Sequence, residues 1–455
     1  MTAGMEARPG GPASAPSGTA SSGTASSGTA SSGAAAPAGR QGQRGLMWAL
    51  FGGNAAVFAV YLGIGQILLP TQVGNIDPGH KVTSLGVITG VGAAFATLLQ
   101  PIGGALSDRT RSRFGRRAPW MLGGALATFA FLLLMGAANG LLLLGVGWVL
   151  AQGAANLVQA ALTAIVPDRV PRERRGTASA MVGAGTTVAT VAGGLIASRF
   201  VDRLGWGYAT LGLVLVAAMA MMVTCTHDPR PDELPAPASS TAPNASADAA
   251  PGFREAARSF LSALAVPDFR WVFLGRALII LSYFSILGYL LYMLDDHITG
   301  VPSGMRHADA VVLLSTISAV VSIVSTMIGG PLSDRLDRRR AFVGVSGLGM
   351  AASLLIPLAS PTWGAMIAYS VVNGLFFGVY MAVDTSLVTL VLPSEGDAGR
   401  DMAVLNIANA GPQIVSPFVA ALVIGLLGGY SALYVVAAVL ALFGAATVLP
   451  IKGVR

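Results

Sequence analysis

The sequence predicts an all-α membrane protein, with twelve transmembrane helices arranged as two pseudo-symmetric six-helix bundles. Hydrophobic residues make up 53% of the 455 residues and charged residues only 11%, whereas a soluble domain carries about 25% charged residues. Apolar stretches of roughly 20 residues recur along the chain, the length that a helix needs to cross ~30 Å of hydrocarbon. A Ser-Asp-Arg loop also occurs twice, once in each half. Together these observations favour a duplicated membrane bundle.

The chain divides into two apolar regions that are separated by polar sequence. The first follows a segment rich in Ser, Gly, Thr and Ala, which has too little apolar surface to form a core and is expected to be disordered. A second polar stretch, rich in Pro, Ala, Ser and Asp, begins at His227. We expect a disordered cytoplasmic N-terminal tail at 1–44, an N-terminal six-helix bundle at 45–226, a cytoplasmic linker at 227–268, a C-terminal six-helix bundle at 269–450 and a cytoplasmic C-terminal tail at 451–455.

Each bundle is predicted to hold six apolar spans. In the first half they fall at about 46–70, 83–106, 119–138, 141–166, 177–199 and 205–226. In the second half they fall at about 270–294, 309–332, 341–360, 363–392, 401–427 and 430–450. Tyr289 and Tyr292 come close to the end of the seventh span and are expected to be interfacial. Asp295, Asp296 and His297 then follow as a solvated loop.

Basic residues are distributed unevenly between the two sides of the predicted bundles. If the N-terminus is cytoplasmic, 23 of the 28 Lys and Arg residues lie in cytoplasmic segments, and cytoplasmic loops are the ones that retain Lys and Arg. The other side holds only Lys81, Arg199, Arg203 and Arg306. The asymmetry predicts a multi-pass protein of the inner (cytoplasmic) membrane with both termini in the cytoplasm. It also accounts for the net charge of +7 without a nucleic-acid partner.

Several chemistries are disfavoured by what the sequence lacks. Cys225 is the single cysteine, and the four histidines fall in predicted loops or at helix ends, so neither a disulfide framework nor a metal site is expected. No Walker-type phosphate-binding motif is present, which disfavours ATP-driven transport. No buried nucleophile is paired with a base, as a hydrolase would need. We therefore expect a protein that is not an enzyme and that uses no cofactor.

The duplicated loop follows the second span of each half. Its first copy reads G-G-A-L-S-D-R-T-R-S-R-F-G-R-R-A-P from Gly103 to Pro119, and its second reads G-G-P-L-S-D-R-L-D-R-R-R from Gly329 to Arg340. Internal repetition of this kind is typical of transporters whose halves rock about a central site. The aspartate can accept hydrogen bonds at the membrane edge, and the arginines can pair with acids of the opposite half in one conformation. The candidate residues of this charge-based latch are Gly104, Ser107, Asp108, Arg109, Gly115, Arg116, Arg117, Gly330, Ser333, Asp334, Arg335 and Arg339.

The loop resembles the signature of the major facilitator superfamily, G-x-x-x-D-R/K-x-G-R/K-R/K between helices two and three. The second copy fits with Asp337 in place of the glycine, whereas the first copy is four residues longer. The longer form is similar to the glycoside–cation symporters and the sucrose–proton symporter-like transporters of that superfamily. Further matches to this branch are Pro167-Asp168 followed by Arg175-Gly176-Thr177-Ala178-Ser179, then Ala382-Val383-Asp384, and Asn406-Ile407-Ala408-Asn409. The resemblance covers about 46–450 and implies the major facilitator fold.

The chain departs from two other branches of that superfamily. Drug–proton antiporters often carry an arginine upstream of Q-G in helix four, and here Val149 stands at that place before Gln152-Gly153. Their helix-five proline is also missing near Ala189. Melibiose-type sodium symporters use carboxylates in helix two, and the stretch 82–106 contains no acid. Sodium coupling by that route is therefore disfavoured.

Ionisable side chains inside a span are costly and are commonly functional. Two stand well inside the predicted spans, Arg276 in the seventh and Asp384 in the tenth. Desolvated Asp384 could carry a proton, or the two residues could form a structural pair. Polar residues at +3 and +4 spacing share helix faces that could line a watery cavity or merely tie helices together. The candidate proton- and substrate-binding residues are Asp384, Arg276, Tyr380, Asn373, Asn406, Asn409, Gln413, Asn54, Tyr61, Asn156, Gln159 and Tyr283.

The function expected from these features is secondary active transport by alternating access, coupled to H⁺, with a sugar or glycoside as the solute. The alternatives are efflux of a small hydrophobic compound or metabolite, and a non-transporting membrane sensor or assembly factor. We expect a monomer in the lipid bilayer whose partners are a small-molecule solute and H⁺.

Overall fold

The computed structural model describes residues 40–110, 112, 115–226, 264–391 and 398–451. Within these ranges the secondary structure is helical, apart from one isolated backbone bridge between Thr299 and Thr362. The main helices of the N-terminal half are α1 (Arg40–Gly63), a π-helical turn (Ile64–Leu68), α2 (Leu69–Ile76), α3 (Lys81–Arg109), α4 (Ala118–Gly136), α5 (Leu141–Arg169), α6 (Arg175–Arg199) and α7 (Leu204–Cys225). Short 3-10 turns at Arg172–Arg174 and Val201–Arg203 precede α6 and α7. The C-terminal half consists of α9 (Pro267–Leu287), α10 (Leu290–Asp296), α11 (His307–Leu336), α12 (Arg339–Ala359), α13 (Trp363–Val391), α14 (Ala398–Leu426) and α15 (Tyr430–Ala446).

The helices confirm the predicted all-α membrane fold. In the described part of the chain, 11 helical segments are long and apolar enough to cross a bilayer, and α15 is a shorter apolar helix. The segment from Arg44 to Ile76 counts once, because the π-helical turn joins α1 to α2 without a break. The predicted and observed spans agree to within a few residues over most of the chain.

Some boundaries differ from the prediction, and two of them bear on the predicted segments. The seventh span was expected to be one helix at 270–294, but it ends at Leu287 and the chain resumes as α10 after Gly288 and Tyr289. The N-terminal tail was expected to be disordered through residue 44, whereas α1 already begins at Arg40. Arg and Gln are good helix formers, which is consistent with the extra turn. The rest of the tail, most of the linker and residues 452–455 lie outside the described residues.

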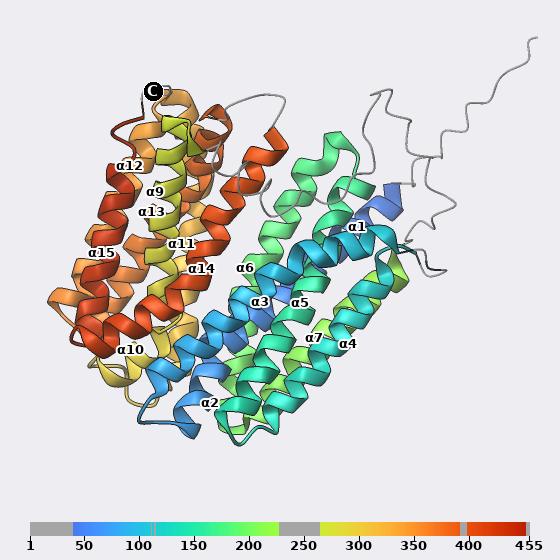
Figure 1. Ribbon diagram of the computed structural model, residues 1–455, viewed down its shortest axis with the longest axis horizontal. Helices are drawn as coiled ribbons and strands as arrows, with labels where there is room; N and C mark the ends of the chain where they lie inside the picture. The colour runs from blue at the N-terminus through green and yellow to red at the C-terminus, as the bar shows by residue number, and fades with distance from the viewer. Residues whose placement is uncertain (1–39, 111, 113–114, 227–263, 392–397, 452–455) are drawn as a thin grey trace, which may run out of the picture. The chain divides into compact units, whose positions relative to one another are not determined.

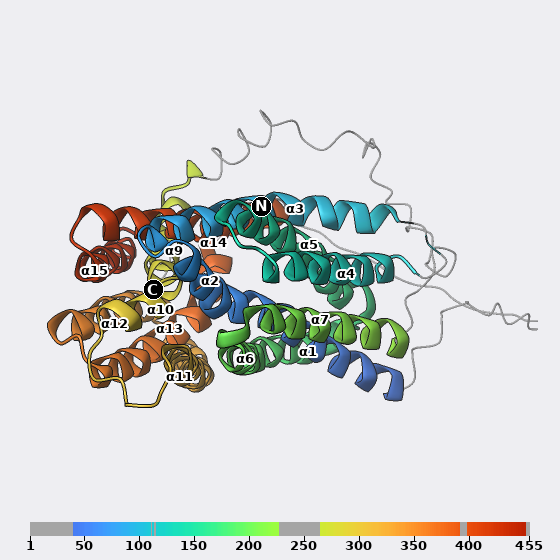
Figure 2. The same cartoon turned by 90° about the horizontal axis from the view of Figure 1, so that it is seen from below.

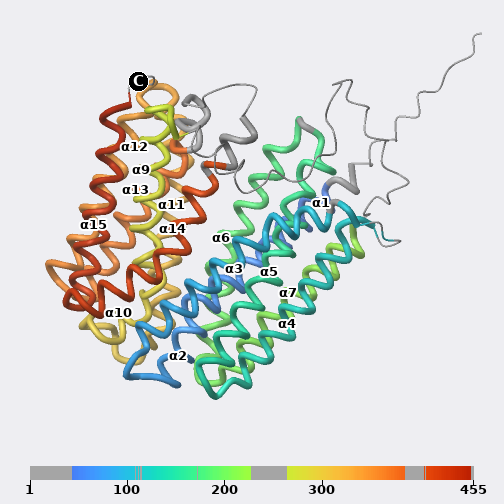
Figure 3. Tube along the Cα trace, in the orientation of Figure 1, coloured from blue at the N-terminus to red at the C-terminus, as the bar shows by residue number. Residues whose placement is uncertain are grey.

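Within each half, the helices pack along their lengths (Figures 1 and 3). In the N-terminal half, α1 packs against α6 and α7, α3 against α5, and α4 against α5 and α7. In the C-terminal half, α11 packs against α13, α12 against α13 and α15, and α9 against α14 and α15. A Cβ added to Gly193 would lie 2.7 Å from the Ala59 backbone, so α6 needs glycine where it crosses α1. Small residues at such crossings are typical of membrane bundles.

The two ends of the molecule differ in how the halves meet. We call the end where α3 and α11 finish the duplicated-loop end, and the opposite end, which carries α2 and α10, the α10 end (Figure 1). The halves pack through α3 against α14 and through α6 against α11. Close approaches between the two halves, such as those of Gly86 to Ala421 and of Gly194 to Val312, lie toward the α10 end.

Candidate functional site

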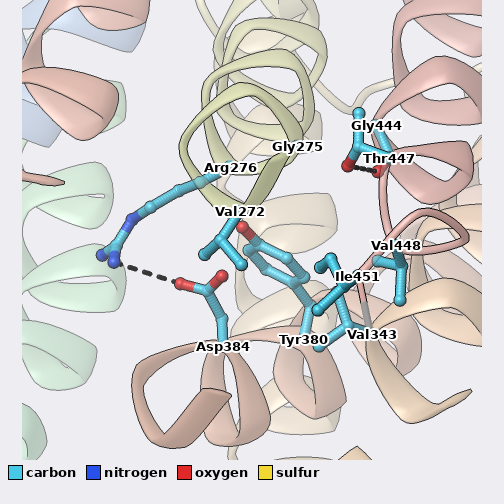
Figure 4. Close-up of a pocket in the computed structure, with 10 residues that line it drawn as sticks. All are labelled: Val272, Gly275, Arg276, Val343, Tyr380, Asp384, Gly444, Thr447, Val448 and Ile451. Carbon is cyan, nitrogen blue, oxygen red and sulfur yellow. Dashed lines mark hydrogen bonds and ion pairs between the residues drawn. The ribbon is translucent and has the colours of Figure 1, made fainter. Parts of the chain in front are cut away.

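An ion pair between two helices of the C-terminal half brings together the two ionisable residues predicted inside spans. Nη1 of Arg276 on α9 lies 3.2 Å from Oδ2 of Asp384 on α13 (Figure 4). The Asp384 side chain is 5% exposed and that of Arg276 is 16% exposed. Because α13 ends at Val391, Asp384 lies roughly 10 Å along the helix from the duplicated-loop end. A charged pair at this depth is expensive unless each charge keeps its partner.

A second contact, between two aromatic rings, joins the same two helices seven residues from the ion pair. The rings of Tyr283 and Phe377 stack with their centroids 4.0 Å apart and their planes at 4°. Tyr283 follows Arg276 by seven residues, and Phe377 precedes Asp384 by seven, as antiparallel helices require. Offset-stacked aromatic pairs add about 0.5–1.5 kcal/mol beyond the area that they bury. The stack therefore helps to hold α9 and α13 in the register that pairs Arg276 with Asp384.

The ion pair borders a cavity of about 10 Å³ inside the C-terminal half. Figure 4 shows ten residues that line it, among them Tyr380 and Thr447. The Arg276 Nε is buried and has no hydrogen-bond partner among the described residues. This volume is about the room that one water molecule needs and far too small for a sugar. The arrangement therefore suits the exchange of a proton or a water better than the binding of a solute.

The predicted amide residues make bonds mostly within or between neighbouring helices of one half. Asn373 donates to Ser353 Oγ at 3.1 Å. Asn54 donates to the Leu50 carbonyl at 2.8 Å and accepts from Gln159 Nε2 at 3.4 Å. Further contacts are those of Asn156 with the Gln152 carbonyl, of Gln413 with the Asn409 carbonyl and of Gln159 with Thr163 Oγ1. Tyr61 has a buried hydroxyl without a partner in the described part of the chain, and Asn406 is exposed.

The first copy of the duplicated loop closes onto α5 of its own half. Arg116 and Arg117 both bind Oδ2 of Asp168 at 2.7 Å, and Arg117 also donates to Ser107 Oγ at 3.1 Å. Gly115 has a φ of +100°, which favours glycine at this turn. These contacts join the ends of α3, α4 and α5. Gly104 and Arg109 lie in the last turns of α3.

The second copy also forms an ion pair within its own half. Arg339 Nη2 lies 2.9 Å from Asp334 Oδ1, while Arg335 is exposed in the last turn of α11. Ser333 is buried, and its hydroxyl has no hydrogen-bond partner among the described residues. Gly330 lies one turn earlier on α11. Asp337 ends α11 in the left-handed conformation, at φ 48°, where the family signature has glycine. The predicted latch across the halves stays a prediction, since the ion pairs described for both loops lie within one half.

A polar cluster at the α10 end was missed by the sequence analysis. Lys81 Nζ lies 2.7 Å from Asp296 Oδ1 and 3.4 Å from Asp295 Oδ2. These two ion pairs join the N-terminal half to the C-terminal half. Tyr430 donates to Asp296 at 2.6 Å, and His307 contacts Asp295 at 3.0 Å. Both aspartates are exposed, as expected, but they end α10 rather than lie in a loop, and their ion pairs were not expected. The sequence did offer a hint of this cluster, because Lys81 is one of only four basic residues predicted on the side opposite the cytoplasm.

Two tyrosines at the same end also correct an expectation. Tyr289 donates to the carbonyls of Val82 and Pro417, each at 3.1 Å, and Tyr292 donates to the Pro70 carbonyl at 2.8 Å. Both side chains are buried rather than interfacial. The helix breaks between α9 and α10, and both tyrosines lie beyond Leu287, where they bond to backbone carbonyls of the N-terminal half. Lys81 also lies 4.9 Å from the centre of the Tyr292 ring.

Replacing Lys81 tests whether this cluster holds the α10 end closed. We expect Lys81→Gln to raise the labelling rate of a cysteine introduced at Ala421, in a Cys225→Ser background, by about twofold to fivefold. This is the range expected when partly exposed ion pairs worth about 0.2–1 kcal/mol each are lost. Labelling with a membrane-impermeant maleimide measures the effect. Arg203→Gln removes a basic residue next to α7 and is the matched control, and equal rates in the two variants would contradict the expectation.

The paired six-helix halves and the repeated charged loop define a multi-span membrane transporter. The chain matches the Major Facilitator Superfamily over residues 45–305 and 272–453, and it belongs to that superfamily, whose members are secondary transporters rather than enzymes. A short segment of 46 residues is 56% identical to an uncharacterised symporter of Synechocystis, covering 10% of this chain and 8% of that protein.

Solved structures share the fold at low sequence identity. A bacterial homologue of the human lysosomal transporter Spinster, in an inward-facing and unoccupied conformation, is 16% identical with a TM-score of 0.63, covering 91% of this chain and 95% of that one. A peptide transporter POT in complex with alafosfalin is 13% identical with a TM-score of 0.69, covering 90% and 94%. A POT family transporter in complex with 5-aminolevulinic acid is 12% identical with a TM-score of 0.65, covering 89% and 95%.

Proposed function

We propose that this chain is a proton-coupled symporter in which Asp384 carries the proton. The observation that carries the proposal is the buried pair of Asp384 and Arg276, 3.2 Å apart beside a water-sized cavity. A proton on Asp384 cancels its charge and frees Arg276, whose Nε already lacks a partner among the described residues. Loss of that proton restores the pair. The two protonation states therefore favour different contacts between α9 and α13, which is what coupling requires.

We propose a sugar or glycoside as the solute. Support comes from the longer first loop copy between Asp108 and Pro119, which resembles that of glycoside–cation and sucrose–proton symporters. Amides such as Asn409, Gln413 and Asn156 are groups that hydrogen-bond a polyhydroxylated molecule. The cavity beside Asp384 is too small for this solute, so its site would lie elsewhere between the halves.

We further propose that the duplicated-loop end faces the cytoplasm of the cytoplasmic membrane. The excess of basic residues on this side supports the orientation. In that orientation the cluster around Lys81 is an outer gate, and the duplicated loops act as an inner gate. The inner gate forms its cross-half contacts in the opposite conformation, when the α10 end opens.

The loop aspartate offers a direct test of the inner gate. We expect Asp108→Asn to lower the transport rate at least tenfold with little change in the solute concentration for half-maximal rate, because a weakened gate slows the conformational step rather than binding. Initial-rate uptake in proteoliposomes measures both quantities. Asp337→Asn, on the loop that departs from the family signature, is the comparison. An unchanged rate in Asp108→Asn would count against the gate.

The function as a whole is tested by uptake of labelled sugars and glycosides into proteoliposomes, with and without an imposed pH gradient. The proposal expects at least one of them to accumulate only when the gradient is present. Absence of sugar flux together with export of a hydrophobic dye from cells would favour efflux instead. No flux of any solute, with correctly folded protein, would favour a non-transporting sensor or assembly factor.

A further inference from the structure

A hollow of about 970 Å³ opens between α12 and α15 in the C-terminal half. Both helices lie at the edge of that half, on the side away from the N-terminal half (Figures 1 and 2). Small residues line part of the hollow, including Gly344, Ala445 and Ala446. No atom lies within 4 Å of the Cβ position at Gly344.

The sides of the hollow face the hydrocarbon of the bilayer. Leu348 on α12 is 51% exposed and Leu442 on α15 is 50% exposed, and both line it. Since α12 is one of the apolar spans and α15 packs along it, these side chains contact lipid tails rather than water. The hollow is therefore an apolar groove within one leaflet.

The end of the groove is basic and lies at the membrane surface. Arg340 donates to the Leu449 carbonyl, which holds its guanidinium between the start of α12 and the end of α15. Arg338 is exposed, and its side chain makes no ion pair or hydrogen bond with the described residues. Asp337 lines the same end, so these three groups have a net charge of +1. Arginines at such a position are the groups that recognise lipid phosphates.

We propose that this groove binds one anionic glycerophospholipid. Its phosphodiester contacts Arg338 and Arg340, and one acyl chain lies along Gly344 and Leu348. A soluble anion has no acyl chain to bury in the apolar part of the groove, so it would bind more weakly. A zwitterionic lipid carries no net negative charge, so the positively charged rim would attract it less. The site is distinct from the pair of Arg276 and Asp384, and it does not depend on which solute is transported.

Native mass spectrometry of the purified full chain tests the site, with phosphatidylglycerol and phosphatidylcholine as the lipids. The wild-type protein should retain one phosphatidylglycerol more tightly than any phosphatidylcholine. Arg338→Gln should weaken that binding about fivefold, the effect expected for one arginine beside an anionic lipid. Gly344→Leu should fill the groove and weaken lipid binding further. The fold should be kept, because leucine suits a helix better than glycine does.

Matched controls come from the N-terminal half. Gly123 is the sixth residue of α4, as Gly344 is of α12, and it is equally open. Arg174 is an exposed arginine at the same end. Gly123→Leu and Arg174→Gln should leave the tightly bound lipid in place. Equal losses in variants and controls would overturn the proposal, as would tight phosphatidylglycerol binding in both Arg338→Gln and Gly344→Leu.

Discussion

Asp384→Asn is expected to abolish accumulation of solute against a gradient while leaving solute exchange in place. A gradient of one pH unit is worth about 1.4 kcal/mol per proton and so about a tenfold accumulation for one proton per solute. In the variant this ratio should fall to about one, because the amide cannot take up the proton. The amide oxygen can still accept a hydrogen bond from Arg276, so α9 and α13 should stay paired. Uptake and counterflow in the same proteoliposomes measure the two activities.

The control for this prediction is a carboxylate with a different environment. The Asp202 side chain lies between α6 and α7, is 80% exposed and pairs with Arg306 at 3.5 Å at the surface, so it is not a buried carboxylate. Asp202→Asn should keep its accumulation ratio. Loss of both accumulation and counterflow in Asp384→Asn would point to a damaged fold, and retained accumulation would eliminate Asp384 as the proton carrier.

Arg276→Gln is expected to have the largest effect on stability among single changes at this site. It leaves the Asp384 carboxylate buried without its cation, and breaking a buried pair in this way costs about 3–5 kcal/mol. The midpoint of thermal unfolding in detergent should fall by several degrees. The double variant Arg276→Gln with Asp384→Asn should recover most of that loss, because neither member is then charged. A double variant no more stable than Arg276→Gln alone would contradict the pairing.

The fold was accessible from the sequence because membrane spans have a strong local signal. Apolar length alone located the spans to within a few residues, and the duplicated loop indicated the two halves. The break at Gly288 was not predicted, since the apolar run continues through Leu294 without a charge. The π-helical turn at Ile64–Leu68 was missed for the same reason. Its Gln66 reaches Ser315 of the other half at 3.3 Å.

The candidate site was only partly accessible in this way. Arg276 and Asp384 were found individually because charge inside a span is rare, but their pairing depends on the register of α9 against α13. The open alternative of a structural pair is consistent with the observed contact and is distinguished from a proton carrier only by transport. Lys81 was missed because it lies just before the predicted second span, and its partners Asp295 and Asp296 lie 214 and 215 positions away.

We propose that solute and proton move together, with the proton carried on Asp384. The most direct measurement is the internal pH of proteoliposomes when a gradient of a transported solute is imposed with no initial pH difference. We predict that solute entry acidifies the interior of wild-type vesicles and that Asp384→Asn vesicles show no such change. Solute entry into wild-type vesicles without acidification, or equal acidification in both, would contradict it.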